Sequence, residues 1–119
     1  MSARVLLVED EGLVALMIED LLADIGCEVV GSCDSIRSAL EWLDLATDAP
    51  DGALLDVNLG GELVYPVAEA LTARRIPFAF ATGYGGLPDG RFEGAPVLTK
   101  PINTARLEEV VRSFSRIST

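Results

Sequence analysis

Four short apolar runs in this chain each end on side chains that handle charge or phosphate. The run at residues 5–8 is followed by Glu9 and Asp10, and the run at residues 53–55 by Asp56. The run at residues 78–81 is followed by Thr82, and the run at residues 97–99 by Lys100. Lys100 is the only lysine in the sequence. If the four runs are parallel strands of one sheet, their carboxyl ends meet, and these five side chains share one crevice.

The chemistry that such a crevice supports is phosphoryl transfer to a carboxylate. Three carboxylates in contact repel one another unless a cation lies between them, and an all-oxygen cluster suits a hard ion such as Mg²⁺. With the charge screened, one carboxylate can act as a nucleophile. Lys100 would supply fixed positive charge, Thr82 would donate a hydrogen bond to a phosphoryl oxygen, and the N–H of Gly83 would be unobstructed. Because the sequence contains no histidine, it excludes His-based catalysis and His metal sites.

The elements that must position these residues are strands alternating with helices. The continuously apolar run at Arg4–Val8 indicates a strand buried on both faces. Five strands are predicted, at Arg4–Val8, Glu28–Ser32, Ala53–Asp56, Phe78–Thr82 and Pro96–Thr99. A turn at residues 50–52 should precede the third strand. The alternation predicts an α/β fold in which 119 residues form one domain, a doubly wound five-stranded parallel sheet with helices on both faces.

Helical patterns lie between most of these strands. The first is a stripe that faces inward and ends at a Gly26 cap, formed by Val14, Met17, Ile18, Leu21, Leu22 and Ile25. A second helix begins at Ser35, a third carries Pro66 in its first turn, and a last one is capped by Asn103. Residues 83–95 contain five glycines and a proline without an apolar stripe. Any fourth helix there should be short or mobile.

The bulk composition narrows the possible partners. The net charge is −10 and no basic run occurs, which argues against binding nucleic acid or an anionic membrane surface. No apolar run approaches the ~18 residues of a membrane span, and the N-terminus lacks a signal-peptide core, so a cytoplasmic protein is expected. Six residues of extended chain would separate Cys27 from Cys33 by ~20 Å, too far for a local disulfide. We interpret both cysteines as small buried hydrophobes.

The ordered set of acidic pair, aspartate, threonine and Lys100-Pro101 resembles the receiver domains of two-component response regulators, along essentially the whole chain. The resemblance implies a flavodoxin-like sheet of order 2-1-3-4-5. It also implies that Asp56 takes a phosphoryl group from the phosphohistidine of a sensor kinase. Mg²⁺ would be held by Glu9, Asp10, Asp56 and the backbone carbonyl of Asn58. Thr82 and Lys100 would contact the phosphoryl group. The chain would then be a phosphoacceptor with only self-phosphorylation and autodephosphorylation activity, not an enzyme acting on other substrates.

A narrower resemblance is to the receiver subgroup with a Phe-Ala-Thr-Gly-Tyr motif, typical of alphaproteobacteria. It rests on the segment from Pro77 to Gly85 and on the residues that follow Asp56, up to Ala68. Members of this subgroup often stand alone, and many look like partners of HWE or related histidine kinases. This resemblance implies a stand-alone module that relays or drains phosphoryl groups, with a kinase or phosphotransfer protein upstream and an unknown protein downstream.

The chain departs from the usual receiver pattern at three places. Most receivers have an aromatic residue three positions before the lysine, where this chain has Val97, and the usual Met-Pro is replaced by Leu59-Gly60. The third place is the glycine-rich segment at residues 83–95, where most receivers have a fourth helix that forms part of the output face. We hypothesise that Tyr84, two residues after Thr82, takes over the switch and that the segment behind it orders on phosphorylation. Asn58 and Tyr84 also occupy positions that should tune hydrolysis of the phosphoryl group.

Three other function classes fit the sequence less well than a phosphoacceptor receiver. A pseudo-receiver scaffold that works without phosphate should have lost an acid, the threonine or the lysine, and none is lost. A phosphohydrolase with an aspartyl nucleophile needs a second acid two residues after Asp56, where this chain has Asn58. Flavin binding needs a Ser/Thr-rich phosphate loop after the first strand, and the acids at residues 9–11 would repel the phosphate.

Overall fold

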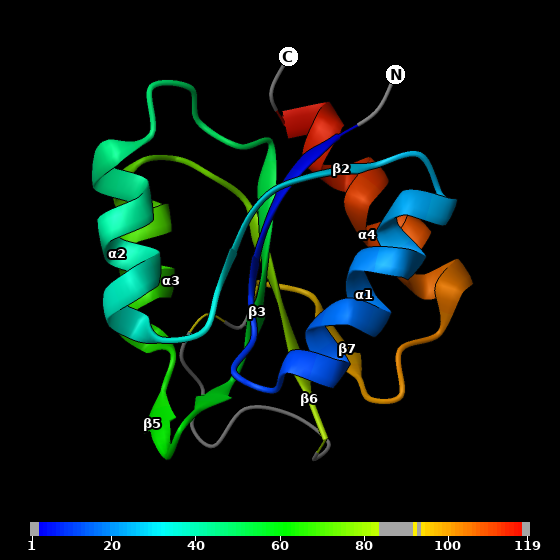
Figure 1. Cartoon of the computed structure of the whole chain (residues 1–119). Coiled ribbons are helices and arrows are strands. Elements are labelled where there is room, and N and C mark those ends of the chain that lie inside the picture. The colour runs from blue at the N-terminus through cyan, green and yellow to red at the C-terminus, as the bar shows by residue number, and fades with distance from the viewer. Residues whose placement is uncertain (1–2, 84–91, 93, 118–119) are drawn as a thin grey trace.

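The computed structural model describes residues 3–83, 92 and 94–117. Its centre is a five-stranded parallel sheet (Figure 1) formed by β1 (Arg4–Val8), β2 (Glu28–Cys33), β3 (Gly52–Asp56), β6 (Phe78–Thr82) and β7 (Val97–Thr99). The order across the sheet is β2-β1-β3-β6-β7, and all neighbouring strands are parallel. Counted along the chain, this is the order 2-1-3-4-5, so the predicted α/β fold is confirmed.

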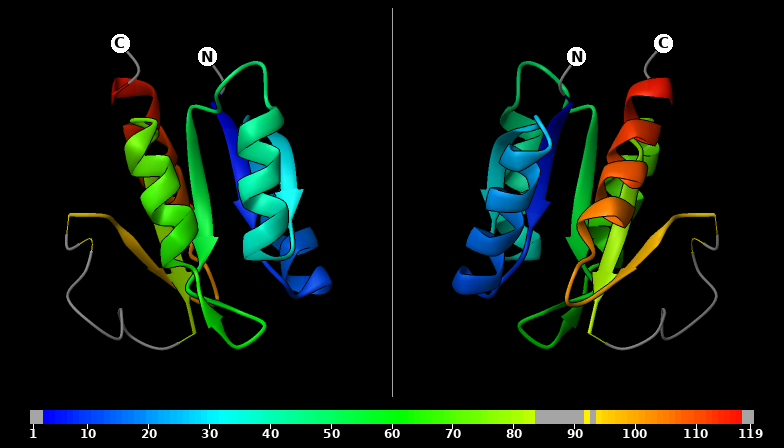
Figure 2. Two further views of the ribbon diagram at one scale, coloured as in Figure 1. Left: turned by 90° about the vertical axis from the view of Figure 1, so that its left-hand side faces the viewer. Right: turned by 90° about the vertical axis from the view of Figure 1, so that its right-hand side faces the viewer.

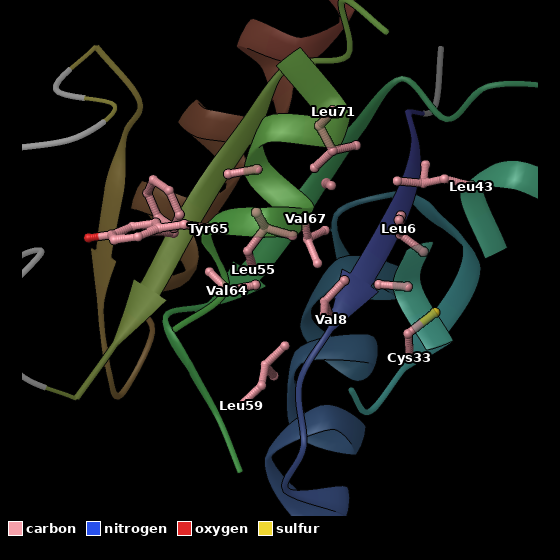
Figure 3. Packing of buried hydrophobic residues seen from close by; sticks show 14 of the residues in the cluster. Leu6, Val8, Cys33, Leu43, Leu55, Leu59, Val64, Tyr65, Val67 and Leu71 are labelled. Carbon is pink, nitrogen blue, oxygen red and sulfur yellow. The ribbon is translucent and has the colours of Figure 1, made fainter. Parts of the chain in front are cut away.

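Helices cover both faces of the sheet (Figures 1 and 2). They are α1 (Gly12–Asp24), α2 (Ile36–Leu45), α3 (Tyr65–Ala73) and α4 (Thr104–Ile117). One core cluster lies between the sheet and the pair α2 and α3, and contains Leu6, Leu55, Val67 and Leu71 (Figure 3). A second cluster packs α1 and α4 against the opposite face. Among the described residues, no helix is both long enough and apolar enough to cross a membrane. The predicted short helix falls mainly on residues 84–91 and 93, outside the described residues.

The helix ends follow the capping residues that the sequence contains. Gly26, with φ of 87°, ends α1, and its N–H donates to the carbonyl of Ala23. Ser35 lies one residue before α2 as its N-cap and accepts a hydrogen bond from the N–H of Ser38. The side chain of Asn103 accepts the N–H of Arg106 at 3.0 Å, which confirms the predicted cap of α4.

The inward stripe predicted for the first helix is wrong at one position. Ala15, Ile18 and Leu22 are the buried residues of α1, whereas Met17 is 55% exposed. Met17 lies about 100° around the helix from Ile18, at the margin of the face that meets the sheet. With Leu13 and Leu16, which are also exposed, it forms an apolar surface on the outer side of α1 that we call the α1 patch.

A small hairpin after β3 is an element that the sequence interpretation missed. Strands β4 (Asn58–Leu59) and β5 (Glu62–Leu63) pair in antiparallel fashion around Gly60 and Gly61. Both glycines have positive φ, 58° and 91°, as a two-residue hairpin turn requires. Two-residue strands show no alternating pattern, so the Gly60-Gly61 pair is the only signal of this hairpin in the sequence.

Gly52 is the first residue of β3 and is buried, although the sequence placed it in the turn before that strand. A Cβ atom at this position would overlap the ring of Phe114 on α4. The glycine is therefore needed for the close approach of α4 to the sheet.

The two cysteines are free thiols, in agreement with the absence of a local disulfide. Cys33 is buried, as predicted, and Cys27 is half-buried. Burial raises the pKa of both thiols, which disfavours the reactive thiolate form.

Candidate functional site

Five of the predicted site residues stand at the carboxyl ends of the parallel strands. Glu9 and Asp10 follow β1, and Asp56 and Thr82 end β3 and β6, while Lys100 follows β7. Since β1 lies between β2 and β3, the acids meet where the strand order reverses, the usual place for a ligand in such sheets. Oxygen atoms of Glu9, Asp10 and Asp56 lie within 4.8 Å of one another. The structure thus brings together the three acids that the sequence singled out.

The lysine joins two of these acids. Lys100 Nζ lies 2.7 Å from Glu9 Oε1 and 3.5 Å from Asp56 Oδ2. Glu9 is 2% exposed and Asp56 is 8% exposed, so both carboxylates have lost most of their contact with water. Asp10 is exposed at the mouth of the site. The site therefore has a buried floor of two acids and one ammonium, and a third acid open to solvent.

The environment of Asp56 favours its neutral form. Burial is the main cause, and a hydrogen bond with Glu9 and the charge of Glu9 add to it, raising the pKa of Asp56 to about 7. Lys100 and the N–H of Asn58, 3.4 Å from Asp56 Oδ1, act in the opposite direction. Burial lowers the pKa of Lys100, but the Glu9 and Asp56 carboxylates outweigh it and the net pKa is raised. The lysine thus stays charged, and two acids share one cation.

The hairpin turn supplies two contacts that the sequence did not predict. The N–H of Gly60 donates to Asp10 Oδ2 at 2.9 Å, and the N–H of Gly61 donates to Asn58 Oδ1 at 2.9 Å. Asn58 is exposed and next to the site, as expected for a residue two positions after Asp56. No pattern in the sequence marks the N–H of Gly60 as a partner of Asp10, because backbone donors carry no signature in residue type.

The carboxyl ends of β6 and β7 are linked through their backbones. The N–H of Lys100 donates to the carbonyl of Thr82 at 2.8 Å, and Thr82 is buried at the end of β6. Gly83 follows and is exposed, and a Cβ there would have no neighbour within 4 Å. Among the described residues, nothing occupies the space into which a side chain at position 83 would project.

The proposed switch positions are only partly described. Val97 is half-buried at the start of β7 and packs against the core cluster on the α2 and α3 side. Four aromatic rings pack against one another in this cluster, from Tyr65, Phe78, Phe80 and Phe92. Tyr84 lies outside the described residues, so its role as a switch stays a hypothesis.

Known proteins resemble this chain in sequence and in fold. No protein-family model matches the sequence. The solution structure of SdrG from Sphingomonas melonis Fr1 is 42% identical, covers 96% of this chain and 97% of its own, and superposes with a TM-score of 0.81. A second SdrG structure, described as the BeF3-activated conformation, has 43% identity and a TM-score of 0.71, over 92% of this chain and 99% of its own.

Two further relatives carry names that state a signalling role. The sensory transduction protein LytT of Bacillus subtilis (strain 168) is 30% identical over 97% of this chain, which spans 49% of LytT. The response regulator REC domain of Erythrobacter litoralis PhyR is 25% identical, with a TM-score of 0.83 over 97% of this chain and 91% of its own. These similarities, the sheet order and the clustered acids and lysine agree, and the chain belongs to the response regulator receiver domains.

Proposed function

We propose that this receiver, residues 1–119, accepts a phosphoryl group on the carboxylate of Asp56 from a phosphohistidine. The observation that carries the proposal is the position of Asp56, buried at the end of β3 with Lys100 Nζ 3.5 Å from its Oδ2 and with oxygens of Glu9 and Asp10 within 4.8 Å. A carboxylate oxygen would attack phosphorus and form a P–O bond while the P–N bond breaks and the imidazole leaves. Lys100 and Thr82 would stabilise the charge on the phosphoryl oxygens, and Gly83 would offer its N–H.

Mg²⁺ is the ion that we propose for this site. The donor set fits it, because three carboxylates with oxygens within 4.8 Å of one another form an all-oxygen site. Glu9, Asp10, Asp56 and the carbonyl of Asn58 would hold the ion. When bound, Mg²⁺ supplies positive charge that keeps carboxylates ionised and offsets charge on phosphoryl oxygens. The raised pKa of Asp56 supports this requirement, since a nucleophilic carboxylate must be ionised at neutral pH.

The proposal is tested by phosphorylation with a small donor. Incubation with acetyl phosphate and Mg²⁺ is expected to add one phosphoryl group, and chelation of the metal with EDTA to prevent it. Intact-protein mass spectrometry measures both results. An unmodified protein in the presence of Mg²⁺ would contradict the proposal and favour a pseudo-receiver scaffold.

We further propose that the phosphodonor protein, a histidine kinase or phosphotransfer protein, docks on the α1 patch. Helix α1 begins only two residues after Asp10, so its outer face lies beside the site that the phosphohistidine must reach. Leu13, Leu16 and Met17 expose 74%, 59% and 55% of their surfaces there. An exposed apolar surface of this kind marks an interaction site.

Replacing Leu16 by Glu should separate docking from chemistry. We expect phosphotransfer from a histidine kinase that phosphorylates the wild type to slow by about tenfold, because a charge would be buried in the interface. The rate with acetyl phosphate should stay within about twofold, since Leu16 does not belong to the core. Leu45→Glu is the control, because Leu45 is 81% exposed at the far end of α2. Equal slowing by both variants, or a loss with acetyl phosphate, would contradict the docking proposal.

We also propose a cytoplasmic location and a kinase class for the donor. Supply of phosphohistidine by ATP-dependent kinases would place the reaction in the cytoplasm, and the modified chain would relay or drain the signal by binding another protein. The run from Phe80 to Tyr84 supports assignment to the Phe-Ala-Thr-Gly-Tyr subgroup and an HWE-type kinase as donor. The BeF3-activated conformation described for SdrG supports activation by a phosphoryl group, which BeF3 imitates.

A further inference from the structure

Asp10 differs from the other two acids of the site in how it is held. Glu9 and Asp56 are buried and contact Lys100. Asp10 is exposed, and the contact that fixes its carboxylate in the described structure is the 2.9 Å hydrogen bond from the N–H of Gly60 to Oδ2. An exposed aspartate without such a bond would sample several rotamers, at a cost in entropy when an ion binds.

The donor of this bond is itself held firmly in place. Leu59 is 3% exposed and packs in the core cluster with Val64 (Figure 3), which anchors the base of the hairpin. The N–H of Val64 donates to the carbonyl of Val57 at 2.9 Å and closes that base. The turn glycines adopt φ of 58° and 91°, values that glycine populates at low cost. The position of the Gly60 N–H is therefore set by the core.

Residue type at position 60 decides whether the bond can exist. The usual Met-Pro of receivers is Leu59-Gly60 in this chain, and proline has no N–H and cannot adopt a positive φ. The bond uses one oxygen of Asp10, so the other oxygen remains for an ion. Hydrogen bonds behind a metal ligand typically change metal affinity by 10–100-fold.

We propose that the Gly60 N–H is the positioning group of the metal site: it orients the Asp10 carboxylate for Mg²⁺ and thereby couples the β4–β5 hairpin to ion binding. The inference rests on the proposed metal role of Asp10. Gly61 has no such role, because its N–H donates to the side chain of Asn58 and not to a carboxylate of the cluster. By reciprocity, an ion that stabilises the Asp10 orientation also stabilises the turn.

Replacing single amides by esters tests the proposal without adding a side chain. An ester oxygen at position 60 removes the N–H donor, and the same change at position 61 is the matched control. We expect the dissociation constant of Mg²⁺, measured by calorimetry, to rise about tenfold for the Gly60 ester and to change less than about twofold for the Gly61 ester. An unchanged affinity for the Gly60 ester, or equal losses for both, would overturn the proposal.

A second measurement needs neither an ester nor an ion. In the NMR spectrum of the ion-free protein, Asp10→Ala should shift the Gly60 amide proton upfield and speed its exchange with solvent, while the Gly61 amide keeps its shift and its exchange rate. A Gly60 amide that does not respond would overturn the inference. If the wild type binds no Mg²⁺ at all, the proposed function fails; if it binds Mg²⁺ and the Gly60 ester binds equally well, only this inference fails.

Discussion

The Asp56→Asn variant is expected to be more stable than the wild type at neutral and alkaline pH in the absence of metal ions. In the folded protein, burial and Glu9 raise the pKa of Asp56 from 3.8 to about 7. The folded state therefore binds more protons than the unfolded chain between these two values. It follows that the free energy of unfolding of the wild type falls as the pH rises from about 4 to about 7, and then levels off.

The size of the effect follows from the same linkage. A pKa raised from 3.8 to about 7 corresponds to at most about 4 kcal/mol at high pH. Asparagine keeps the shape of the side chain and has no charge, so we expect a gain of about 1–3 kcal/mol near pH 8 and almost none near pH 4. Urea unfolding at several pH values measures it. Asp48→Asn, which removes a charge at an exposed position, should change the stability by less than about 0.5 kcal/mol. A gain for Asp56→Asn that does not depend on pH would contradict this account of the site.

The Gly52→Ala variant should be strongly destabilised. Gly52 is buried at the start of β3, and an added Cβ would overlap the ring of Phe114, which is 1% exposed on α4. Neither the central strand nor the buried ring can move freely, so we expect a loss of about 3 kcal/mol in the free energy of unfolding. Denaturant titration followed by circular dichroism measures this loss.

Two further variants test the cause of that loss. Phe114→Leu makes room beside position 52, so the double variant should lose less than the sum of the single variants, with a coupling of about 1–2 kcal/mol. Gly12→Ala is the matched glycine control, because a Cβ at Gly12 meets no atom within 4 Å. Strictly additive losses in the double variant would mean that the ring of Phe114 is not the obstacle.

Much of the fold could be predicted because its three central strands, β1, β3 and β6, are buried on both faces. The runs ending at Val8, Asp56 and Thr82 are continuously apolar, and their alternation with helical stripes leaves few topologies. The acids and Lys100 stand at strand ends, so the sheet order alone brings them together. Residue types and topology are thus sufficient to predict which acids and which lysine come together in the site.

The features that were missed depend on geometry that residue type does not encode. The exposure of Met17 depends on the width of the contact between α1 and the sheet, which a helical stripe cannot give. The role of Gly52 depends on a ring 62 positions later in the chain. The hydrogen bond of Gly60 to Asp10 joins residues 50 positions apart through a backbone group. Each needs a three-dimensional distance between residues that are remote in sequence.

The central claim, that Asp56 is the phosphoacceptor, is tested most directly by locating the modified residue. After treatment with acetyl phosphate and Mg²⁺, borohydride reduces an aspartyl phosphate to homoserine, and peptide mass spectrometry then finds its position. The account predicts homoserine at position 56 of the wild type and nowhere else. Homoserine at another acid, or none in a protein shown to be folded, would contradict it.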